Sequence, residues 1–330
     1  MSETAATPFF SVALCTHNGA SYIEEQLLSI LDQEPAPTQL VVSDDASSDD
    51  TIARVRAVAA RYPEVQLTVF ENSPPLGVTK NFEQAIRACT GDLIALSDQD
   101  DVWHAGRLAL FAAQFAAHPA VSLLHSDARL VDGAGVPLGH TLSEALGVST
   151  SEVASIHAGD AFSVMLRRNL VTGACAVFRR SLVEFAAPFP PSWVHDEWLG
   201  IIAAAVASTD FVEQPTIDYR QHGSNQIGAT KLSLRGKFGR MMEPRRDRNA
   251  RLETNMTVLV DRLQRLGGRV DAGKLSRARA KLEHERMRNS LPEGRLSRIP
   301  SVARAFAAGR YGHYSRGPLD AVRDIVQPVG

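Results

Sequence analysis

The chain has 330 residues, of which 44% are hydrophobic and 22% charged, so it can bury the core of one large α/β domain with an appendage. Its three cysteines lie in apolar runs without C-x-x-C spacing, which does not indicate a disulfide framework or a zinc site and favours a reducing cytoplasm. The longest apolar run, 199–207, is too short to cross a bilayer, and the first ten residues lack the features of a signal peptide.

The formal net charge of −2 conceals an uneven distribution of charge along the chain. Residues 231–330 hold 23 Lys and Arg against 10 Asp and Glu, whereas the residues before them hold 12 against 27. The sequence therefore predicts an acidic region followed by a basic one. A basic region of this kind could meet nucleic acid, anionic lipid or a polyanionic partner, and a solvated helical face is the alternative.

The first hundred residues alternate between predicted strands and helices. Apolar and β-branched runs predict four strands, at 10–15, 40–42, 65–70 and 92–96. Apolar residues at helical spacing predict three helices between them, beginning after Ser21, after Ser48 and at Thr79. Ser21 is expected to form a capping box with Glu24, and Ser48 together with Asp49 and Asp50 is expected to cap the second helix. This alternation predicts a mainly parallel, doubly wound sheet.

Polar loops follow the carboxyl ends of three of these strands, at 16–18, 44–45 and 98–101. In open parallel sheets ligands bind beyond this edge, so we expect the three loops to meet at one site. No G-x-G-x-x-G follows the first strand, and no G-x-x-x-x-G-K-[ST] occurs in the chain. Phosphate groups would therefore be held by something other than a glycine-rich loop.

Three carboxylates crowd the end of the fourth predicted strand. Asp98, Asp100 and Asp101 directly follow the buried run 92–96, where they repel one another unless a cation, hydrogen-bond donors or water offset their charge. A divalent cation such as Mg²⁺ or Mn²⁺ prefers carboxylate oxygens and leaves positions open for substrate phosphates. A solvated acidic loop is the alternative, but the buried strand favours a metal–diphosphate site at Asp98 and Asp100. Asp101 is expected to hydrogen-bond the backbone or support the next helix.

The second half of the chain is less regular. The apolar run 121–131 is followed by a polar stretch to about Ala158, which we interpret as a long loop. A strand is predicted at 169–178, a helix at 195–207, and two short strands before residue 220. Beyond Ala229 the pattern predicts basic helices, with breaks at Pro244, Gly267-Gly268, Pro292 and Pro300.

Seven segments in order resemble the family 2 inverting glycosyltransferases of GT-A fold, especially bacterial rhamnosyltransferase-like members. They are 12–18, 41–49, 76–82, 97–103, 171–173, 195–196 and 219–225. The resemblance extends over about residues 8–230. It implies a GT-A domain, Rossmann-like with a mainly parallel sheet, at 1–230, followed by a basic α-helical region at 231–330.

The resemblance also implies which residues would bind the donor nucleotide. Thr16 and Asp45 would contact the nucleoside, Lys80 would lie nearby, Asp98 would meet the ribose and Asp100 the metal. Each residue has a structural alternative. Asp45 could cap the next turn, the Thr16 hydroxyl could stabilise its own loop, and Lys80 could simply be solvated.

Inverting transfer needs a base that removes the acceptor hydroxyl proton as the hydroxyl attacks the anomeric carbon. Asp196 matches the base of the family, and Glu197 is its rival. Arg220 and His222 could offset the charge of the leaving diphosphate, and His222 could also ligate the metal. Asn225 belongs to the same motif.

The function implied by the resemblance is transfer of one sugar, L-rhamnose from dTDP-rhamnose, to a cell-surface polysaccharide or its lipid-linked precursor. The chain lacks the Q-x-x-R-W motif and membrane helices of processive members, so one sugar is expected for each reaction. One alternative is a sugar-phosphate nucleotidyltransferase, although 16–19 does not match its glycine-rich loop. Another is a catalytically silent carbohydrate-binding or scaffold module, although the carboxylates and His222 are intact. We expect a nucleotide-sugar donor, a glycan acceptor and no nucleic acid.

Basic and apolar side chains mix at loosely helical spacing from Arg304 to Ile325. This pattern suits a membrane surface as well as a packed bundle. We expect a cytoplasmic protein with peripheral attachment to the inner face of the cytoplasmic membrane, where a lipid-linked acceptor would lie.

Overall fold

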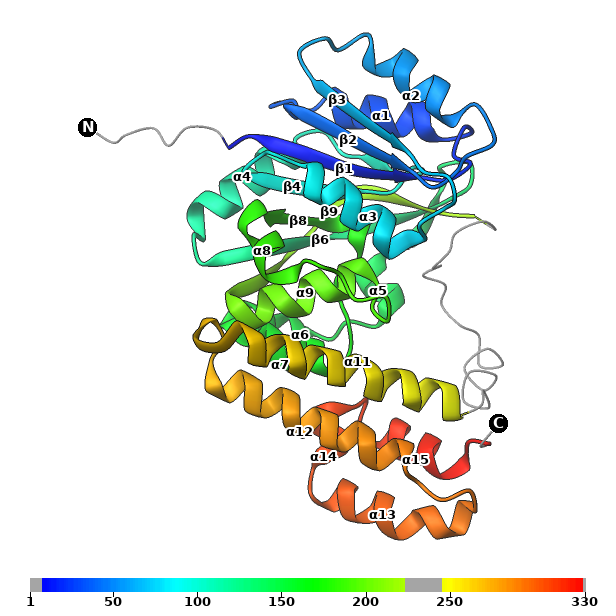
Figure 1. The fold of residues 1–330 in the computed structure, drawn as a ribbon, viewed down its shortest axis with the longest axis vertical. Coiled ribbons are helices and arrows are strands. Elements are labelled where there is room, and N and C mark those ends of the chain that lie inside the picture. Colours follow the sequence, from blue (N-terminus) through cyan, green and yellow to red (C-terminus); the bar gives the residue numbers. More distant parts are fainter. Residues whose placement is uncertain (1–7, 223–244, 329–330) are drawn as a thin grey trace, which may run out of the picture. The chain divides into compact units, whose positions relative to one another are not determined.

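The structure is a computed structural model that describes residues 8–222 and 245–328 (Figure 1). The chain divides into two compact units. The first comprises 1–159 and 170–229, and the second comprises 160–169 and 230–330. That the chain forms two domains divided at residue 230 stays a prediction. In the structure, residues 160–169 belong to the same compact unit as the C-terminal helices. Among the described residues, no helix is long and apolar enough to span a membrane.

A mixed sheet forms the centre of the first unit (Figure 1). Its strands are β1 Phe10–Thr16, β2 Gln39–Asp44, β3 Gln66–Glu71, β4 Leu93–Ser97, β5 Val102–Trp103, β6 Val121–Asp132, β7 Pro137–Thr141, β8 Ala176–Arg179 and β9 Ser208–Gln221. The order is β3-β2-β1-β4-β8-β6-β9-β5, with β7 paired to β6. The neighbours of β1 and β2 are all parallel, as is the β6–β9 pair, whereas β8 runs antiparallel to β4 and β6. The predicted mainly parallel sheet is confirmed.

Helices cover both faces of the parallel strands. The helices of this unit are α1 Ile23–Leu31, α2 Thr51–Ala59, α3 Val78–Ala88, α4 Arg107–Ala117, α5 Leu142–Leu146, α6 Thr150–Ser155, α8 Val183–Ala186 and α9 His195–Val206. Val12 and Leu14 of β1 join one apolar core with residues of α1, α2 and α4, while α3 contacts β1 and β2 and also packs with α9. Burial on both faces explains why these strands are continuously apolar.

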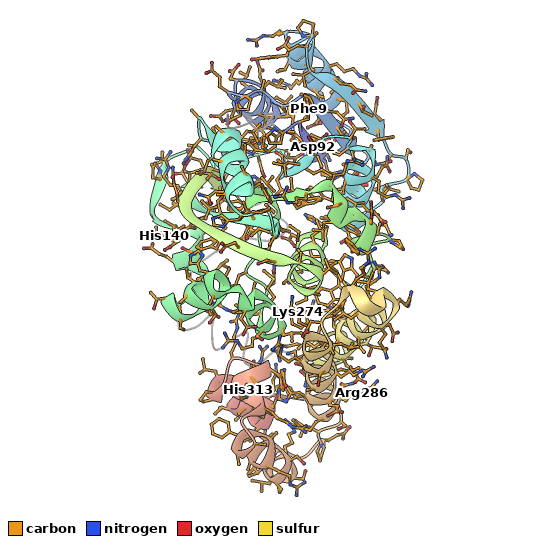
Figure 2. The ribbon with its side chains drawn as sticks, turned by 90° about the vertical axis from the view of Figure 1, so that its left-hand side faces the viewer. Phe9, Asp92, His140, Lys274, Arg286 and His313 are labelled. Atoms are coloured by element: carbon orange, nitrogen blue, oxygen red, sulfur yellow. The ribbon has the colours of Figure 1, made fainter. Side chains whose placement is uncertain are left out.

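The amino-terminal ends of β1 and β4 are joined beside this core. The Phe9 backbone N–H donates to Oδ2 of Asp92 at 3.2 Å, and Figure 2 shows the two residues close together. The register then pairs Phe10 with Leu93 and Leu14 with Ser97. The polar residues that follow Thr16 and Ser97 consequently leave the sheet at the same edge.

The two predicted caps at Ser21 and Ser48 are wrong. The first helix begins after Tyr22, which makes no side-chain cap, because backbone N–H groups of Tyr22 and Ile23 bond the Gly19 carbonyl instead. The second begins after Asp50, which makes no side-chain cap, whereas the neighbouring Asp49 carboxylate accepts from the Thr51 backbone N–H at 3.0 Å. Both loops are instead shaped by contacts with other strand ends, which local sequence does not reveal.

The predicted long loop up to Ala158 is also wrong, because it contains β7, α5 and α6. Two capping boxes start these helices, one between Thr141 and Glu144 and the other between Ser149 and Glu152. Their S/T-x-x-E spacing is a signal that the sequence contains. The predicted strand at 169–178 is shorter than expected, since a 3₁₀ turn, η2 Gly173–Cys175, precedes β8. The two short strands expected before residue 220 are the single strand β9.

The second unit is helical, as predicted. Its helices are α7 Ala161–Arg167, α11 Arg245–Leu266, α12 Ala272–Asn289, α13 Arg295–Ala307, α14 Arg310–Tyr314 and α15 Pro318–Val326. The breaks at Gly267-Gly268 and Pro292 are confirmed, whereas Pro244 lies outside the described residues. The break at Pro300 is wrong, because α13 continues through it. Helix α13 packs on α15 beside a small apolar core that includes Val302 and Tyr311. This packing stabilises the helix on both sides of Pro300.

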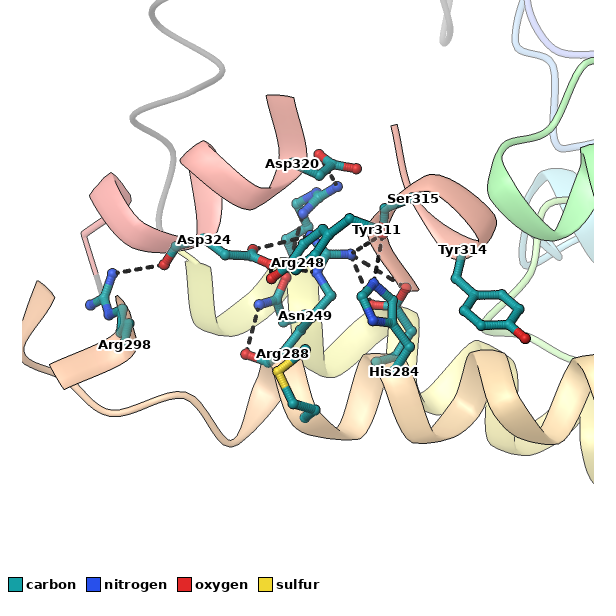
Figure 3. A network of polar contacts seen from close by, with 12 residues as sticks. Arg248, Asn249, His284, Arg288, Arg298, Tyr311, Tyr314, Ser315, Asp320 and Asp324 are labelled. Carbon is teal, nitrogen blue, oxygen red and sulfur yellow. Dashed lines mark hydrogen bonds and ion pairs between the residues drawn. The ribbon is translucent and has the colours of Figure 1, made fainter. Parts of the chain in front are cut away.

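Buried charges hold this unit together (Figure 3). Arg288 is almost fully buried and binds both carboxylate oxygens of Asp324, at 2.7 and 3.1 Å, and also Glu285 at 3.0 Å. Arg298 is equally buried and donates to the carbonyl oxygens of Ile325 and Gln327 at the end of α15. Guanidinium groups near the carboxyl end of a helix complement its dipole and satisfy its last carbonyls. Part of the basic composition is therefore internal and paired.

Candidate active site

Polar loops at the carboxyl ends of β1, β2 and β4 are bound to one another. The Gln99 side-chain amide donates to the His17 carbonyl oxygen at 3.0 Å, and its oxygen accepts from the His17 backbone N–H at 2.8 Å. A Cβ on Gly19 would lie 2.2 Å from that Gln99 oxygen, so a larger residue there would displace the Gln99 side chain from these two bonds. The His17 ring bonds the Asp45 carbonyl oxygen at 2.7 Å. The three loops that were predicted to meet therefore do so.

Thr16 and Asp45 both use their side chains to shape these loops. Thr16 is buried, and its hydroxyl donates to Oδ1 of Asp44 at 2.6 Å. The Asp45 carboxylate accepts from the backbone N–H groups of Leu76 and Gly77, the latter at 3.0 Å. Both side chains therefore have structural partners, but these partners lie in other segments of the chain and not in the local loop or turn that was considered as the alternative. The predicted contacts with a nucleoside stay predictions.

Lys80 lies in the first turn of α3. Its ammonium group donates to the Glu83 carboxylate and, at 3.0 Å, to the carbonyl oxygen of Phe189. Its side chain is 43% exposed. The lysine is thus held on the helix surface by partners within the protein, and its role near the nucleotide stays a prediction.

Asp98 differs from its neighbours because its carboxylate makes no hydrogen bond or ion pair with any residue in 8–222 or 245–328. Desolvation by the surrounding protein, reinforced by the charges of Asp100 and Asp196, raises its pKa to about 7. The side chain keeps some exposure. A carboxyl group with two acidic neighbours and no donor in the described part of the chain is suited to bind a hydroxyl group or a cation.

Asp100 is paired with His222. Nε2 of His222 lies 2.8 Å from Oδ2 of Asp100, and the two side chains are only 13% and 12% exposed. Asp101 is more deeply buried, and its Oδ1 accepts from the Arg220 backbone N–H at 2.9 Å. Burial, followed by the charges of Asp100 and Asp98, raises the pKa of Asp101 well above its usual range. The expectation that Asp101 supports the backbone is confirmed.

The Arg220 side chain binds the backbone of the acidic loop. Nε donates to the Asp100 carbonyl oxygen at 2.7 Å, Nη1 to the Gly133 carbonyl oxygen at 3.1 Å, and Nη2 to the Glu25 carboxylate at 2.7 Å. The guanidinium is buried and stacks over the ring of Tyr22 at 4.9 Å. In this arrangement Arg220 fixes the position of Asp100, while its predicted contact with the donor diphosphate stays a prediction.

Tyr22 is a site residue that sequence reasoning missed. Besides Arg220, its ring stacks on His222 with centroids 5.0 Å apart and an interplanar angle of 20°. Tyr22 immediately precedes α1, about 200 positions before the residues that it contacts. No local pattern in the sequence could have indicated this pairing, because it depends on the return of β9 to the edge of the sheet.

Asp196 lies in the first turn of α9, and its carboxylate is oriented by two backbone N–H groups. Oδ2 accepts from Gly173 at 2.9 Å, and Oδ1 accepts from Glu197 at 2.7 Å. Gly173, which binds this carboxylate, belongs to η2, and η2 contacts β4, the strand that precedes Asp98; the charge of Asp196 also contributes to the raised pKa of Asp98. The structure therefore brings Asp98, Asp100, Asp196 and His222 to one place. Asn225 lies outside the described residues.

The ring of His195 packs against Gly173, next to the contact between Gly173 and Asp196. Its ring stacks on Phe82 with centroids 3.7 Å apart, and both of its buried ring nitrogens have no hydrogen-bond partner among the described residues. Burial lowers the pKa of His195, so the ring is neutral. A Cβ on Gly173 would lie 2.8 Å from Nε2 of His195 and 3.6 Å from Oδ2 of Asp196. The close approach of this backbone to the buried His195 ring favours glycine at this position.

The sequence of this chain also matches a known protein family. The model of the family described as "Glycosyl transferase family 2" matches residues 11–185, which is more than half of the chain. The chain belongs to glycosyl transferase family 2. The match includes the loops with Thr16, Asp45 and Asp98 but ends before Asp196 and His222. Membership of this family argues against the alternative that the protein is a sugar-phosphate nucleotidyltransferase.

Several known proteins are similar to this glycosyltransferase. The dTDP-rhamnosyl transferase RfbG of Shigella flexneri is 24% identical over 237 residues, which cover 69% of this chain and 78% of RfbG. S. aureus TarS 1-349, solved in complex with UDP-GlcNAc, has a TM-score of 0.57 at 16% identity and covers 91% of this chain and 81% of its own. The mannosyltransferase PcManGT from Pyrobaculum calidifontis, solved with GDP-Man and Mn²⁺, has a TM-score of 0.54 at 22% identity and covers 96% and 78%. These likenesses confirm the GT-A fold.

The side chains at the site of this family 2 glycosyltransferase suit a divalent cation that arrives with its substrate. No group of three or more metal-binding side chains occurs in the part of the chain that the structure describes. A Mg²⁺-like cation bound to substrate phosphates, however, needs only one or two protein ligands. The neighbouring side chains of Asp100 and His222 have the donor atoms for such a cation.

Proposed function

We propose that this glycosyltransferase transfers a single L-rhamnose residue from dTDP-rhamnose, with inversion, to a cell-surface polysaccharide or its lipid-linked precursor. The observation that carries the proposal is the carboxylate of Asp98, which has no partner among the described residues and lies near Asp100 and Asp196. Three carboxylates gathered at the carboxyl edge of a sheet are expected to bind a ligand that brings a cation or hydroxyl groups, and a metal-bound nucleotide sugar brings both.

Donor binding is assigned to residues on both sides of the acidic loop. Asp98 would accept hydrogen bonds from the ribose, and Asp100 with His222 would hold the cation. Thr16 and Asp45 would shape the nucleoside pocket through their bonds to Asp44 and to the 76–77 backbone. A bound divalent cation would offset the negative charge that develops on the leaving diphosphate.

Asp196 is the proposed general base. The N–H groups of Gly173 and Glu197 hold its carboxylate in one orientation, and each oxygen keeps a lone pair for a further contact. When the acceptor hydroxyl attacks the anomeric carbon, its proton would pass to Asp196 as the bond to the diphosphate oxygen breaks. Attack from the face opposite the leaving group inverts the anomeric configuration.

Rhamnose is proposed as the sugar because RfbG, which is similar over most of both chains, is described as a dTDP-rhamnosyl transferase. The solved relatives carry UDP-GlcNAc and GDP-Man, so the fold accommodates more than one nucleotide sugar. The donor must therefore be determined directly.

The test is incubation of the protein with dTDP-rhamnose, UDP-GlcNAc and GDP-mannose, each with Mn²⁺, Mg²⁺ or EDTA, followed by measurement of nucleoside diphosphate release. We expect release from dTDP-rhamnose that EDTA abolishes, and an NMR spectrum of the product in which the anomeric configuration is inverted. Faster release from another donor would contradict the rhamnose assignment alone. Absence of donor binding by calorimetry for all three donors would support the silent module instead.

A further inference from the structure

The solvent-facing side of α13 is apolar. We define the outer face of α13 as Leu296, Ile299, Pro300, Ala303, Phe306 and Ala307, all of which are exposed. Leu296 is 81%, Ile299 41% and Phe306 48% exposed. The opposite face, with Arg298, Val302 and Ala305, is the buried one. A surface helix normally presents polar side chains outward, so this helix is apolar on the side where a soluble protein requires polarity.

The residues of the outer face share one side of the helix because of their spacing. Positions 296, 299, 303 and 306 follow the i, i+3, i+7, i+10 pattern, which places them in a single stripe. Arg295 and Arg304 flank this stripe on opposite sides, at about 100° and 80° from Leu296 by the 3.6-residue period. Both arginines are exposed. The helix thus presents an apolar ridge with a cation on each side.

The charges around this ridge have one sign. Residues 294–328 contain six arginines and only two acids, Asp320 and Asp324, which are both buried. Asp324 is held by Arg288. The guanidinium groups of Arg295 and Arg304 have no ion-pair partner among the described residues. The exposed surface of this segment is therefore apolar and cationic without a compensating carboxylate.

Helix α15, which packs on α13, also carries apolar side chains on its exposed side. Leu319 is 73% exposed and Val322 is 50% exposed, whereas Asp320 and Ala321 on the other side are buried. Isolated apolar side chains are common on the surface of any protein. Here, however, two adjoining helices both carry large apolar residues on their exposed sides.

We propose that the outer face of α13 binds the surface of a membrane that contains anionic lipids. Leu296, Ile299 and Phe306 would enter the region between headgroups and acyl chains, and the flanking Arg295 and Arg304 would extend toward the lipid phosphates. Charge complementarity favours this occupant. A second copy of the chain would bring the unpaired arginines toward each other, and a nucleic acid would leave the apolar ridge exposed.

The experiment measures sedimentation of the full chain with large vesicles of phosphatidylcholine alone or of phosphatidylcholine mixed with phosphatidylglycerol. The test variant is Leu296→Asp with Phe306→Asp. The matched control is Val136→Asp with Leu138→Asp, because these side chains on the first unit are 57% and 44% exposed. We expect binding to the phosphatidylglycerol vesicles, a loss of about tenfold or more in the test variant, and no change in the control. Arg295→Gln with Arg304→Gln should weaken binding about tenfold.

All of these substitutions are at exposed positions, so circular dichroism and thermal melting should match those of the parent chain. Failure of the full chain to sediment with the anionic vesicles would overturn the proposal, as would equal binding by parent and test variant. Binding to phosphatidylcholine alone with the same affinity would refute the role of the arginines. If sedimentation velocity shows self-association that the test variant abolishes, the face is an interface between copies instead.

Discussion

Nε2 of His222 lies 2.8 Å from Oδ2 of Asp100, which joins residues 122 positions apart at the carboxyl edge of the sheet. Asp100 follows β4 and His222 follows β9, and these strands are separated by β8 and β6 in the sheet. The contact therefore depends on the whole order of strands. It also places an imidazole and a carboxylate where the two could share one cation.

Replacement of His222 by Ala should weaken metal-dependent donor binding. The imidazole is both the partner of Asp100 and a proposed metal ligand, so its loss should raise the Mn²⁺ concentration for half-maximal activity about 10- to 100-fold. Titration of Mn²⁺ in the nucleotide-release assay measures this change. His118→Ala, at an exposed histidine after α4, is the control and should leave the titration unchanged. An unaltered titration for His222→Ala would exclude it as a ligand.

Replacement of Tyr22 should reveal whether its ring holds the His222 and Arg220 side chains. Tyr22→Phe keeps the stacking and should retain the parental KM for the donor, whereas Tyr22→Ala should raise that KM about three- to tenfold with a smaller effect on kcat. Steady-state kinetics at saturating metal give both constants. Equal kinetics for the Ala and Phe variants would show that the ring has no positioning role.

Asp196→Asn should bind donor but fail to transfer sugar. The amide keeps the shape of the side chain but cannot take a proton, so kcat should fall about 100- to 10,000-fold. Calorimetry with the donor should give a dissociation constant close to the parental one. Glu197→Gln tests the rival base in the same assay, and it should keep most of the activity. The reverse result would transfer the role to Glu197.

Gly173→Ala should reduce catalysis without loss of the fold. The added Cβ would lie 2.8 Å from the His195 ring and would move the backbone N–H that orients Asp196, so kcat should fall by about 100-fold at most. Gly268→Ala is the control, because its Cβ would meet no atom within 4 Å. Single-turnover kinetics isolate the chemical step. A parental rate would mean that the Gly173 contact is dispensable for the base.

Acid should destabilise the helical unit through His284. This side chain is buried, bonds Ser315 at 2.9 Å, and has its pKa lowered from 6.5 to about 3, chiefly by desolvation. Below pH 6.5 the unfolded chain binds a proton that the folded chain does not, so stability should decrease as pH falls from about 6.5 toward 3. The total effect is on the order of a few kcal/mol.

The measurement is thermal melting between pH 7 and pH 4 for the parent chain and for His284→Gln, which can still bond Ser315. The Gln variant should lose less stability over this interval. His313→Gln, at an exposed histidine in the same unit, should follow the parent curve. A Gln variant with the parental pH dependence would show that other groups cause the acid sensitivity.

The sequence by itself determined the class of fold and the family. Buried strands such as β4, whose residues 93–96 are all apolar, are covered on both faces, so local composition reveals them. The acidic run after β4 and the polar residues after β1 and β2 are recognisable because strand ends in a parallel sheet share one edge. Helix starts at Thr141 and Ser149 could have been found in the same way, from their capping boxes.

Only the tertiary structure decided how the individual side chains are used. It divided three neighbouring carboxylates into Asp98, which has no partner within 8–222 and 245–328, Asp100 beside His222, and Asp101 buried against the Arg220 backbone. It paired Tyr22 with Arg220 of β9 and turned Arg288 and Arg298 of the C-terminal region inward, while α13 carries its apolar face outside. These outcomes depend on contacts between residues far apart in the chain, and a local pattern cannot specify which distant group will fill the space beside a side chain.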